Sequence, residues 1–290
     1  MTSVPAATAR RRIGLIGAGA IGTTVGADFL LHGFDVVFVD RDEQTLSAAA
    51  AKVAEAVRFA PLLRPRLARL SRADLTDRTR YVVDLGALAD CEFVVENVTE
   101  DWVVKQALYR RLDAVLPPHV GIGVNTSSIS IQRLAAETTR PDRVIGIHFM
   151  NPSYATEAVE VMRGVNTSDA CLTYVSELLQ SLGKHAIVVG DFPGFVSNRI
   201  SHVFFNEAAR LVQEEGVEPT TVDQVFKRCF GHTMGPLETA DLIGLDTVVL
   251  TLRHLQESTR EERYEPCELL QQKVAAGEVG RKTGRGFYRY

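Results

Sequence analysis

The sequence predicts an α/β protein, with an N-terminal Rossmann-like doubly wound sheet that carries a helical-hairpin insertion, followed by an all-α C-terminal domain. Three observations support this fold class. A glycine-rich turn joins an apolar run to a helical pattern within residues 12–32, short apolar runs then alternate with helical patterns, and helical patterns dominate after Asp191. Strands that alternate with helices build parallel sheets. We therefore expect a domain built on the sheet over residues 1–191 and a helical domain over residues 192–290.

The chain opens with a predicted strand–helix–strand unit. Arg12–Gly17 is a short apolar run of the kind that forms a buried strand. Helical spacing follows over Ala20–His32, and Gly33 stands where helix C-termini favour glycine. Phe34–Val39 is a second apolar run, and together these segments predict two parallel strands joined by a helix.

The later elements are assigned by the same alternation. Residues 42–72 look helical but contain Pro61, so two helices broken near Pro61 are expected. Strands are expected at Phe93–Val98, Gly121–Val124, Val144–Phe149, Ala158–Met162 and Ala186–Val189, and helices at Glu100–Leu116 and Ser168–Leu182. The second domain is expected to contain helices at Gly194–Glu215, Thr221–Phe230, Pro236–Ile243 and Leu245–Glu257.

The composition of the chain argues against several classes of protein. The 290 residues are 46% hydrophobic and have a net charge of −4, which excludes intrinsic disorder and argues against nucleic-acid or anionic-membrane partners. The 4 cysteines form no C-x-x-C pair, and no metal site is expected. No apolar run approaches the length of a membrane span, and the N-terminus lacks the apolar core of a secretion signal. A cytoplasmic location is therefore expected, with an organellar one as the alternative.

The glycine turn Gly17-x-Gly19-x-x-Gly22 predicts a dinucleotide site. Glycines let the backbone approach a pyrophosphate, and the following helix N-terminus offers N–H groups to that anion. Asp40 ends the next strand, 18 residues after Gly22, where a carboxylate accepts hydrogen bonds from ribose hydroxyls and repels a 2′-phosphate. NAD is therefore expected, through Gly17, Gly19, Ala20, Ile21, Gly22 and Asp40. Arg41 could instead hold the 2′-phosphate of NADP.

Three further groups of residues could carry chemistry. Ser127 follows a predicted strand in Asn125–Ser128, and Asn198 lies at the start of the helical part; each could bind a substrate oxygen or simply cap a helix. His148 ends another strand, where a general base belongs in a doubly wound sheet. The alternation around Glu160 could aim its carboxylate at His148. The alternative is a core histidine and a surface glutamate.

Eight motifs together are more specific than any of these residues. They are GAGAIG at 17–22, VVENVTE at 94–100, NTSSISI at 125–131, HFMNP at 148–152, VEV at 159–161, PGFVSNR at 193–199, MGPLE at 234–238 and GRKTGRGFY at 280–288. In identity and order they resemble the 3-hydroxyacyl-CoA dehydrogenase family from about Arg12 to Tyr290.

The resemblance implies a role for each matching residue. His148 would be the catalytic base paired with Glu160, and Ser127 and Asn198 would bind the reacting oxygen. Cofactor contacts are implied for Glu100, Lys105 and Asn125, and a substrate contact for Asn151. The family also implies NAD, an acyl thioester substrate and a homodimer formed through the C-terminal helices.

One segment departs from the family pattern. Family members have a stretch like V-P-x-M-K-L after the N-P pair, whereas this chain has Tyr154 and Glu157 there. A different acyl pocket is therefore expected. Dehydrogenation of an acyl-carrier-protein thioester, or of carnitine, a sugar acid or another free hydroxy acid, stays an alternative to a CoA thioester. A non-catalytic, crystallin-like cofactor binder is the remaining alternative.

Arginines are concentrated in the expected hairpin. No acidic residue interrupts Arg58–Arg72, a segment in which the family holds the CoA end of its substrate. Arg58 and Arg66 could pair with CoA phosphates or with an acidic carrier protein. The alternative is a solvated helix face.

Overall fold

The computed structural model describes residues 10–290. Residues 1–9 lie outside the described residues, and the expectation that the N-terminus carries no secretion signal falls partly on them. The chain forms two compact units, the first ending at Asp191 and the second beginning at Phe192.

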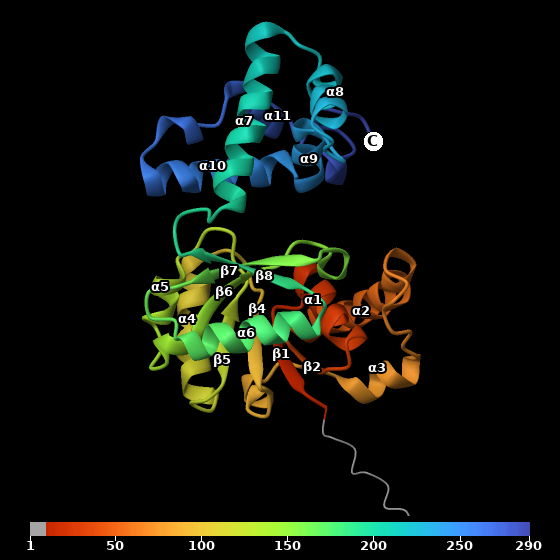
Figure 1. The fold of residues 1–290 in the computed structure, drawn as a ribbon, viewed down its shortest axis with the longest axis vertical. Coiled ribbons are helices and arrows are strands. Elements are labelled where there is room, and N and C mark those ends of the chain that lie inside the picture. Colours follow the sequence, from red (N-terminus) through yellow and green to blue (C-terminus); the bar gives the residue numbers. More distant parts are fainter. Residues whose placement is uncertain (1–9) are drawn as a thin grey trace, which may run out of the picture. The chain divides into compact units, whose positions relative to one another are not determined.

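The first unit is built on one 8-stranded sheet, ordered β3-β2-β1-β4-β5-β6-β7-β8 (Figure 1). Neighbouring strands are parallel except β6 and β7, which are antiparallel. The expected doubly wound sheet is confirmed. The strands are β1 (Arg12–Ile16), β2 (Asp35–Val39), β3 (Thr79–Val82), β4 (Phe93–Glu96), β5 (Gly121–Val124), β6 (Val144–His148), β7 (Ala158–Arg163) and β8 (His185–Gly190).

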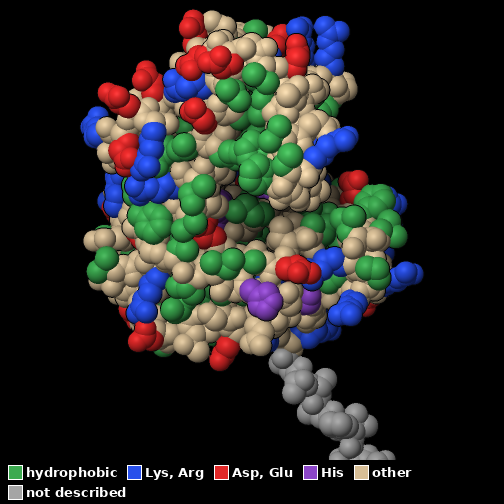
Figure 2. All heavy atoms as spheres, turned by 45° about the horizontal axis from the view of Figure 1, so that its top comes forward, with side chains coloured by type: hydrophobic (Ala, Val, Ile, Leu, Met, Phe, Trp, Pro, Cys, Tyr) green, Lys and Arg blue, Asp and Glu red, His purple; other side chains and the backbone are tan. Residues whose placement is uncertain are grey.

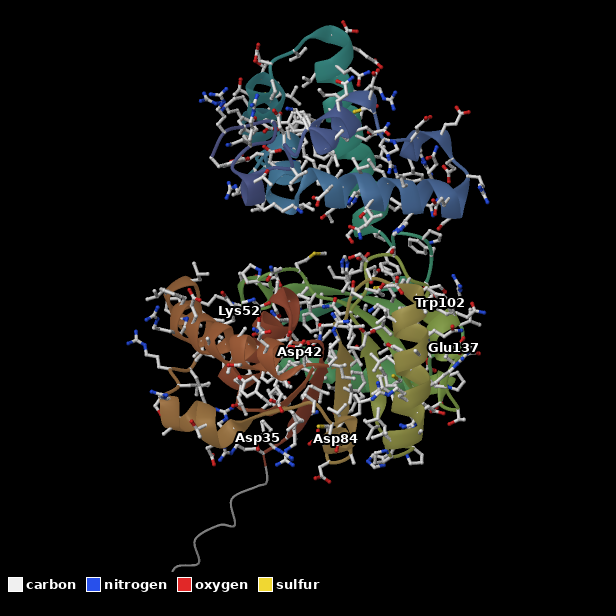
Figure 3. The ribbon with its side chains drawn as sticks, turned by 180° about the vertical axis from the view of Figure 1, so that it is seen from behind. Asp35, Asp42, Lys52, Asp84, Trp102 and Glu137 are labelled. Carbon is white, nitrogen blue, oxygen red and sulfur yellow. The ribbon has the colours of Figure 1, made fainter. Side chains whose placement is uncertain are left out.

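Helices cover both faces of the sheet. On one face, α1 (Ala20–Leu31), α2 (Glu43–Leu63) and α6 (Asp169–Ser181) share a single apolar core with the strands, and α6 lies in front of the sheet in Figure 1. The opposite face carries α4 (Trp102–Val115), which lies in front of the sheet in Figure 3, with Trp102 in its first turn. The short helix α5 (Ile131–Ala135) packs against α4.

The hairpin insertion differs from the sequence prediction at its proline. Helix α2 continues through Pro61 and ends two residues later, at Leu63. Pro65 ends the helix instead, since the residue before a proline avoids helical backbone angles, and Arg64 has φ −131° and ψ 89°. The chain returns through α3 (Arg72–Arg78) to β3, an edge strand that the sequence analysis missed.

The second unit is helical, as expected. It contains α7 (Ser197–Glu215), α8 (Pro219–Cys229), α9 (Pro236–Ile243), α10 (Leu245–Thr259) and the unexpected α11 (Glu268–Ala275) around one apolar core. The buried carboxylate of Asp241 holds the C-terminal segment by accepting hydrogen bonds from the backbone N–H groups of Phe287 and Tyr288, each at 2.9 Å. In residues 10–290, no helix combines the length and the apolar character that crossing a membrane requires.

The C-terminal end of α1 carries a charged pair. His32 Nδ1 lies 2.8 Å from the backbone oxygen of Asp28 and 3.3 Å from its Oδ1. Burial alone would lower the pKa of His32, but the hydrogen bonds and charge of Asp28 outweigh burial and raise it above its ordinary value. A raised pKa in the folded state means that the protonated histidine stabilises the fold.

Replacing His32 by Gln tests this contribution. The stabilisation is fully present below the unfolded-state pKa of about 6.5 and is lost as the pH rises through the raised folded-state pKa. We expect His32→Gln to lower the free energy of unfolding by about 1 kcal/mol near pH 5.5, and by progressively less at higher pH. Urea denaturation at several pH values measures this difference. The exposed His119 provides the control variant His119→Gln, for which a flat, near-zero difference is expected. A difference for His32→Gln that does not change with pH would contradict the charge-based account.

Candidate active site

A crevice opens where the strand order reverses between β1 and β4. A cavity of about 750 Å³ lies there, lined by the glycine turn, the end of β2 and the residues that follow β4. Gly17 has φ +86°, and a Cβ on it would lie 2.7 Å from the backbone of Asn97. A Cβ on Gly22 would lie 2.0 Å from the Gly17 oxygen. The turn therefore requires glycine at both positions.

Gly19, the middle glycine of the turn, has open space beside it instead of backbone atoms. A Cβ on Gly19 would meet no atom within 4 Å, so the N-terminus of α1 is open at this point. Gly19 is the N-cap of α1, and no side chain caps it. Open backbone at a helix N-terminus suits a pyrophosphate, so the residues present fit a dinucleotide.

Asp40 ties the end of β2 to the glycine turn. Its Oδ2 accepts a hydrogen bond from the Ala18 N–H at 2.7 Å, and its Oδ1 accepts one from the Arg41 N–H at 2.7 Å. Each carboxylate oxygen can accept a second hydrogen bond. The carboxylate is therefore fixed at the cavity wall and can still accept bonds from ribose hydroxyls. Arg41 and Arg111 also line this cavity.

The register of β6 and β7 places His148 opposite Glu160. These two residues are direct partners in the antiparallel pair, so their side chains lie on the same face of the sheet. His148 Nδ1 and Glu160 Oε2 are 3.1 Å apart, and both side chains are largely buried. The contact expected from the alternation around Glu160 is present.

Ser127 meets the other nitrogen of the same imidazole. Its Oγ lies 3.2 Å from His148 Nε2. A carboxylate has no proton to donate, so a neutral His148 bonded to Glu160 carries its hydrogen on Nδ1. This leaves the Nε2 lone pair directed toward the Ser127 hydroxyl. The arrangement can accept a proton from a hydroxyl group bound beside Ser127.

Glu100 holds the turn that carries Ser127. Its Oε1 accepts hydrogen bonds from Thr126 Oγ1 at 2.5 Å, the Ser127 N–H at 2.9 Å, the Ser128 N–H at 2.8 Å and Ser128 Oγ at 3.1 Å. Bonds to a charged acceptor are stronger than neutral ones. The carboxylate therefore fixes the backbone on both sides of the Ser127 side chain.

A buried ion pair lies next to this turn. Lys105 Nζ is 2.7 Å from Glu96 Oε1, and both side chains are 0% exposed. Burial raises the pKa of Glu96, while the charge of Lys105 opposes that effect. Lys105, for which the resemblance implies a cofactor contact, thus has its ammonium enclosed by protein, and a direct contact with the cofactor stays a prediction. Glu96 was not singled out from the sequence.

The remaining predicted residues fall in different places. Asn125 links three strand ends, since its Nδ2 donates to Asn97 Oδ1 at 2.8 Å and its Oδ1 accepts from the Phe149 N–H at 3.2 Å. Asn151 is exposed just after β6. Asn198 lies in the first turn of α7 in the second unit, so its approach to His148 stays a prediction.

Comparisons with known proteins agree with this geometry. A family model described as the NAD binding domain of 3-hydroxyacyl-CoA dehydrogenase matches residues 12–192, and a model of the C-terminal domain matches residues 194–290. The 3-hydroxybutyryl-CoA dehydrogenase of Bradyrhizobium diazoefficiens is 40% identical over 280 residues, which cover 97% of this chain and 95% of the relative. A probable 3-hydroxybutyryl-CoA dehydrogenase of Deinococcus radiodurans is 38% identical over 287 residues, covering 96% and 100%.

Solved structures give the same result. The crystal structure of (S)-3-hydroxybutyryl-CoA dehydrogenase from Ralstonia eutropha superposes with a TM-score of 0.89 at 36% identity. The match covers 97% of this chain and 99% of that structure.

The turn held by Glu100 can be tested by Glu100→Gln, which keeps the side-chain size but removes the charge. Weaker bonds to the turn should displace Ser127 and lower kcat for NADH-linked reduction by about 10- to 100-fold. The dissociation constant for NADH, measured by fluorescence, should change by less than kcat does.

Glu137→Gln is the matched control. Glu137, labelled beside α4 in Figure 3, bonds to Gln106 at 2.7 Å and to Arg110 at 2.8 Å rather than to the turn. The Glu137→Gln variant should therefore leave kcat unchanged. Weaker NADH binding with an unchanged kcat in Glu100→Gln would make Glu100 a cofactor contact only.

Proposed function

The chain belongs to the 3-hydroxyacyl-CoA dehydrogenase family, and we propose that its substrate is a short-chain thioester of the 3-hydroxybutyryl-CoA type. As a family member it is an NAD-dependent oxidoreductase. Several relatives, including those from Bradyrhizobium diazoefficiens and Deinococcus radiodurans, are named for 3-hydroxybutyryl-CoA. The observation that carries the proposed mechanism is the buried contact of 3.1 Å between His148 Nδ1 and Glu160 Oε2.

His148 acts as the general base in this proposal. Its Nε2 takes the proton of the 3-hydroxyl group, while Glu160 keeps the other nitrogen protonated and stabilises the imidazolium that forms. A bound NAD⁺ would supply the hydride acceptor for the carbon that carries this hydroxyl. In the reverse direction the imidazolium donates its Nε2 proton to the 3-keto oxygen.

Ser127 and Asn198 bind the reacting oxygen as charge develops on it. The Ser127 hydroxyl already lies beside His148 Nε2, at 3.2 Å, so an oxygen bound there can contact both groups. The Asn198 amide supplies a further donor from the first turn of α7.

The cofactor lies along the glycine turn in this proposal. Gly17, Gly19 and the first residues of α1, Ala20 to Gly22, bind the pyrophosphate, and Asp40 binds the adenosine ribose. Glu100, Lys105 and Asn125 then belong to the nicotinamide end, with Lys105 acting through its neighbours because it is buried.

The hairpin supplies the contacts to CoA. Arg58 and Arg66 are exposed, and in the described part of the chain neither has a carboxylate within ion-pair distance, so both are open to phosphate groups. Arg64 differs, because its NH2 lies 3.7 Å from Glu157 Oε1 and its NH1 lies 3.4 Å from the Thr156 oxygen. Arg64 therefore holds the segment that departs from the family pattern, and we assign it no phosphate.

Two further parts of the proposal concern the protein's state in the cell. We infer a homodimer through the second unit, where hydrophobic side chains of α7, α8 and α10 are exposed. Figure 2 shows hydrophobic side chains, in green, on the surface of the molecule. Ile200 is 66% exposed, Phe230 67% and Leu250 54%, and large apolar side chains of this kind are suited to burial against a second subunit. A cytoplasmic location fits the bacterial relatives.

A substrate panel tests the proposed function. NADH oxidation is followed with acetoacetyl-CoA, with acetoacetyl groups on acyl carrier protein, and with free acetoacetate. We expect kcat/KM for the CoA thioester to exceed that for the free acid by at least about 100-fold, because binding energy from the CoA end helps to place the reacting carbon. Preference for the carrier protein or for a free acid would replace the proposed substrate, and no turnover with any of them would indicate a non-catalytic binder.

The same assay tests the CoA contacts. Arg66→Glu combined with Arg69→Glu should raise KM for acetoacetyl-CoA at low salt and leave NADH affinity unchanged. Arg228→Glu with Arg253→Glu makes the same charge change in the second unit and should leave KM unchanged. Equal KM values in the two double variants would indicate that the hairpin arginines do not contact CoA and only form a solvent-exposed helix face.

A further inference from the structure

Helix α1 carries a row of polar side chains that its role in cofactor binding does not explain. Thr24, Asp28 and His32 are spaced by four residues and therefore lie on one face of the helix. Asp28 is 0% exposed in a helix whose other buried side chains are mostly apolar. A buried carboxylate is costly unless a partner compensates for its desolvation, so this row has a specific partner.

That partner is the loop that follows β6, residues 151–156. Ser153 Oγ donates to Asp28 Oδ2 at 2.7 Å, and the Ser153 N–H donates to Thr24 Oγ1 at 3.4 Å. Thr24 Oγ1 also lies 3.2 Å from Asn151 Oδ1 and 3.0 Å from the Ile21 oxygen, so its single hydrogen is shared between these two acceptors. The helix that begins at the glycine turn therefore contacts, about one and two turns along its length, the loop that begins three residues after His148.

Lys184, in the turn between α6 and β8, completes the contact. Its ammonium donates to the backbone oxygens of Ser153 and Thr156, each at 2.7 Å, and lies 3.0 Å from Asp28 Oδ2. Three acceptors satisfy the three N–H groups of the ammonium. The Lys184 side chain is 0% exposed, so these bonds do not compete with water.

Stability alone does not account for this pair. A buried ion pair commonly contributes no more to stability than two well-packed apolar side chains would. Apolar side chains, however, could not bind the two carbonyl oxygens and the hydroxyl of the loop. What the ion pair adds is therefore a fixed conformation of residues 151–156.

We propose that Thr24, Asp28 and Lys184 are positioning residues, which join α1 and the 151–156 loop into one rigid body and orient the Asn151 amide. Because Asn151 presents its Oδ1 to Thr24, the two Nδ2 donors of this exposed side chain are left for another acceptor. Asn151 then acts as a hydrogen-bond donor toward the bound substrate or cofactor. The inference rests on the proposed function only for the identity of that acceptor.

Thr24→Val is the mildest test, because it keeps the side-chain shape and removes only the hydroxyl. We expect kcat for 3-ketoacyl thioester reduction to fall about tenfold, while the NADH dissociation constant and the melting temperature stay near the wild-type values. The control is Thr23→Val on the same helix, since the Thr23 hydroxyl bonds only to the Gly19 and Ala20 oxygens and should leave kcat unchanged. Equal kcat values for the two variants would overturn the proposal.

The ion pair is tested by Lys184→Met alone and combined with Asp28→Asn. Lys184→Met removes the ammonium from the buried Asp28 carboxylate and leaves it only Ser153 and His32 as partners, so both stability and kcat should fall. The double variant removes that charge and should recover stability, yet kcat should stay low because the loop carbonyls remain unbound. A kcat that recovers together with stability would show a merely structural role.

Hydrogen–deuterium exchange supplies a readout that does not depend on turnover. Thr24→Val and the double variant should speed amide exchange in residues 150–157, whereas Thr23→Val should not. Unchanged exchange in the loop would contradict the proposal even if no substrate had been identified. Conversely, faster exchange in a chain that reduces no thioester would count against the proposed function only.

Discussion

The pairing of β6 with β7 is the constraint on which the active site depends. Because β7 runs antiparallel to β6 in an otherwise parallel sheet, Glu160 lies directly opposite His148. A slip of one residue would turn the carboxylate to the other face of the sheet. The imidazole then has one nitrogen bonded to Glu160 and the other beside Ser127, at 3.2 Å. The reversal of one strand thus fixes which nitrogen is available to a substrate.

Buried charges hold the segments around this pair. Glu100 accepts four hydrogen bonds from the turn that carries Ser127, and the Glu96–Lys105 pair lies beneath the same strand ends. In the segment that follows β6, Asp28 and Lys184 bond the loop that carries Asn151. In each case a carboxylate or an ammonium bonds to backbone groups of a loop. Such bonds give irregular segments a definite conformation that apolar packing alone would leave variable.

Local patterns made much of this site predictable. The glycine turn and Asp40 follow a spacing set by the dinucleotide geometry, and the alternation around Glu160 indicated a side chain directed at His148. Contacts between segments that are distant in the sequence were harder to predict. The local sequence pattern does not indicate that β7 runs antiparallel to β6 or that Glu96 pairs with Lys105, since both features depend on tertiary packing. The spacing of Thr24, Asp28 and His32 was a readable signal, because a carboxylate in an apolar helix needs a partner. The expected break near Pro61 is present, but the helix ends two residues later, at Leu63, because Pro65 restricts the backbone of Arg64.

The central mechanistic question is whether His148 and Glu160 act as one catalytic unit. A double-mutant cycle with His148→Gln, Glu160→Gln and the combined variant, measured as kcat for NADH-linked reduction of a 3-ketoacyl thioester, tests this directly. Each single change should lower kcat by about 10²–10⁴-fold, and the double change should cost little more than the worse single change, because coupled groups are not additive. NADH should still bind all three variants through the glycine turn. Fully additive losses, or a kcat that survives Glu160→Gln, would contradict the account.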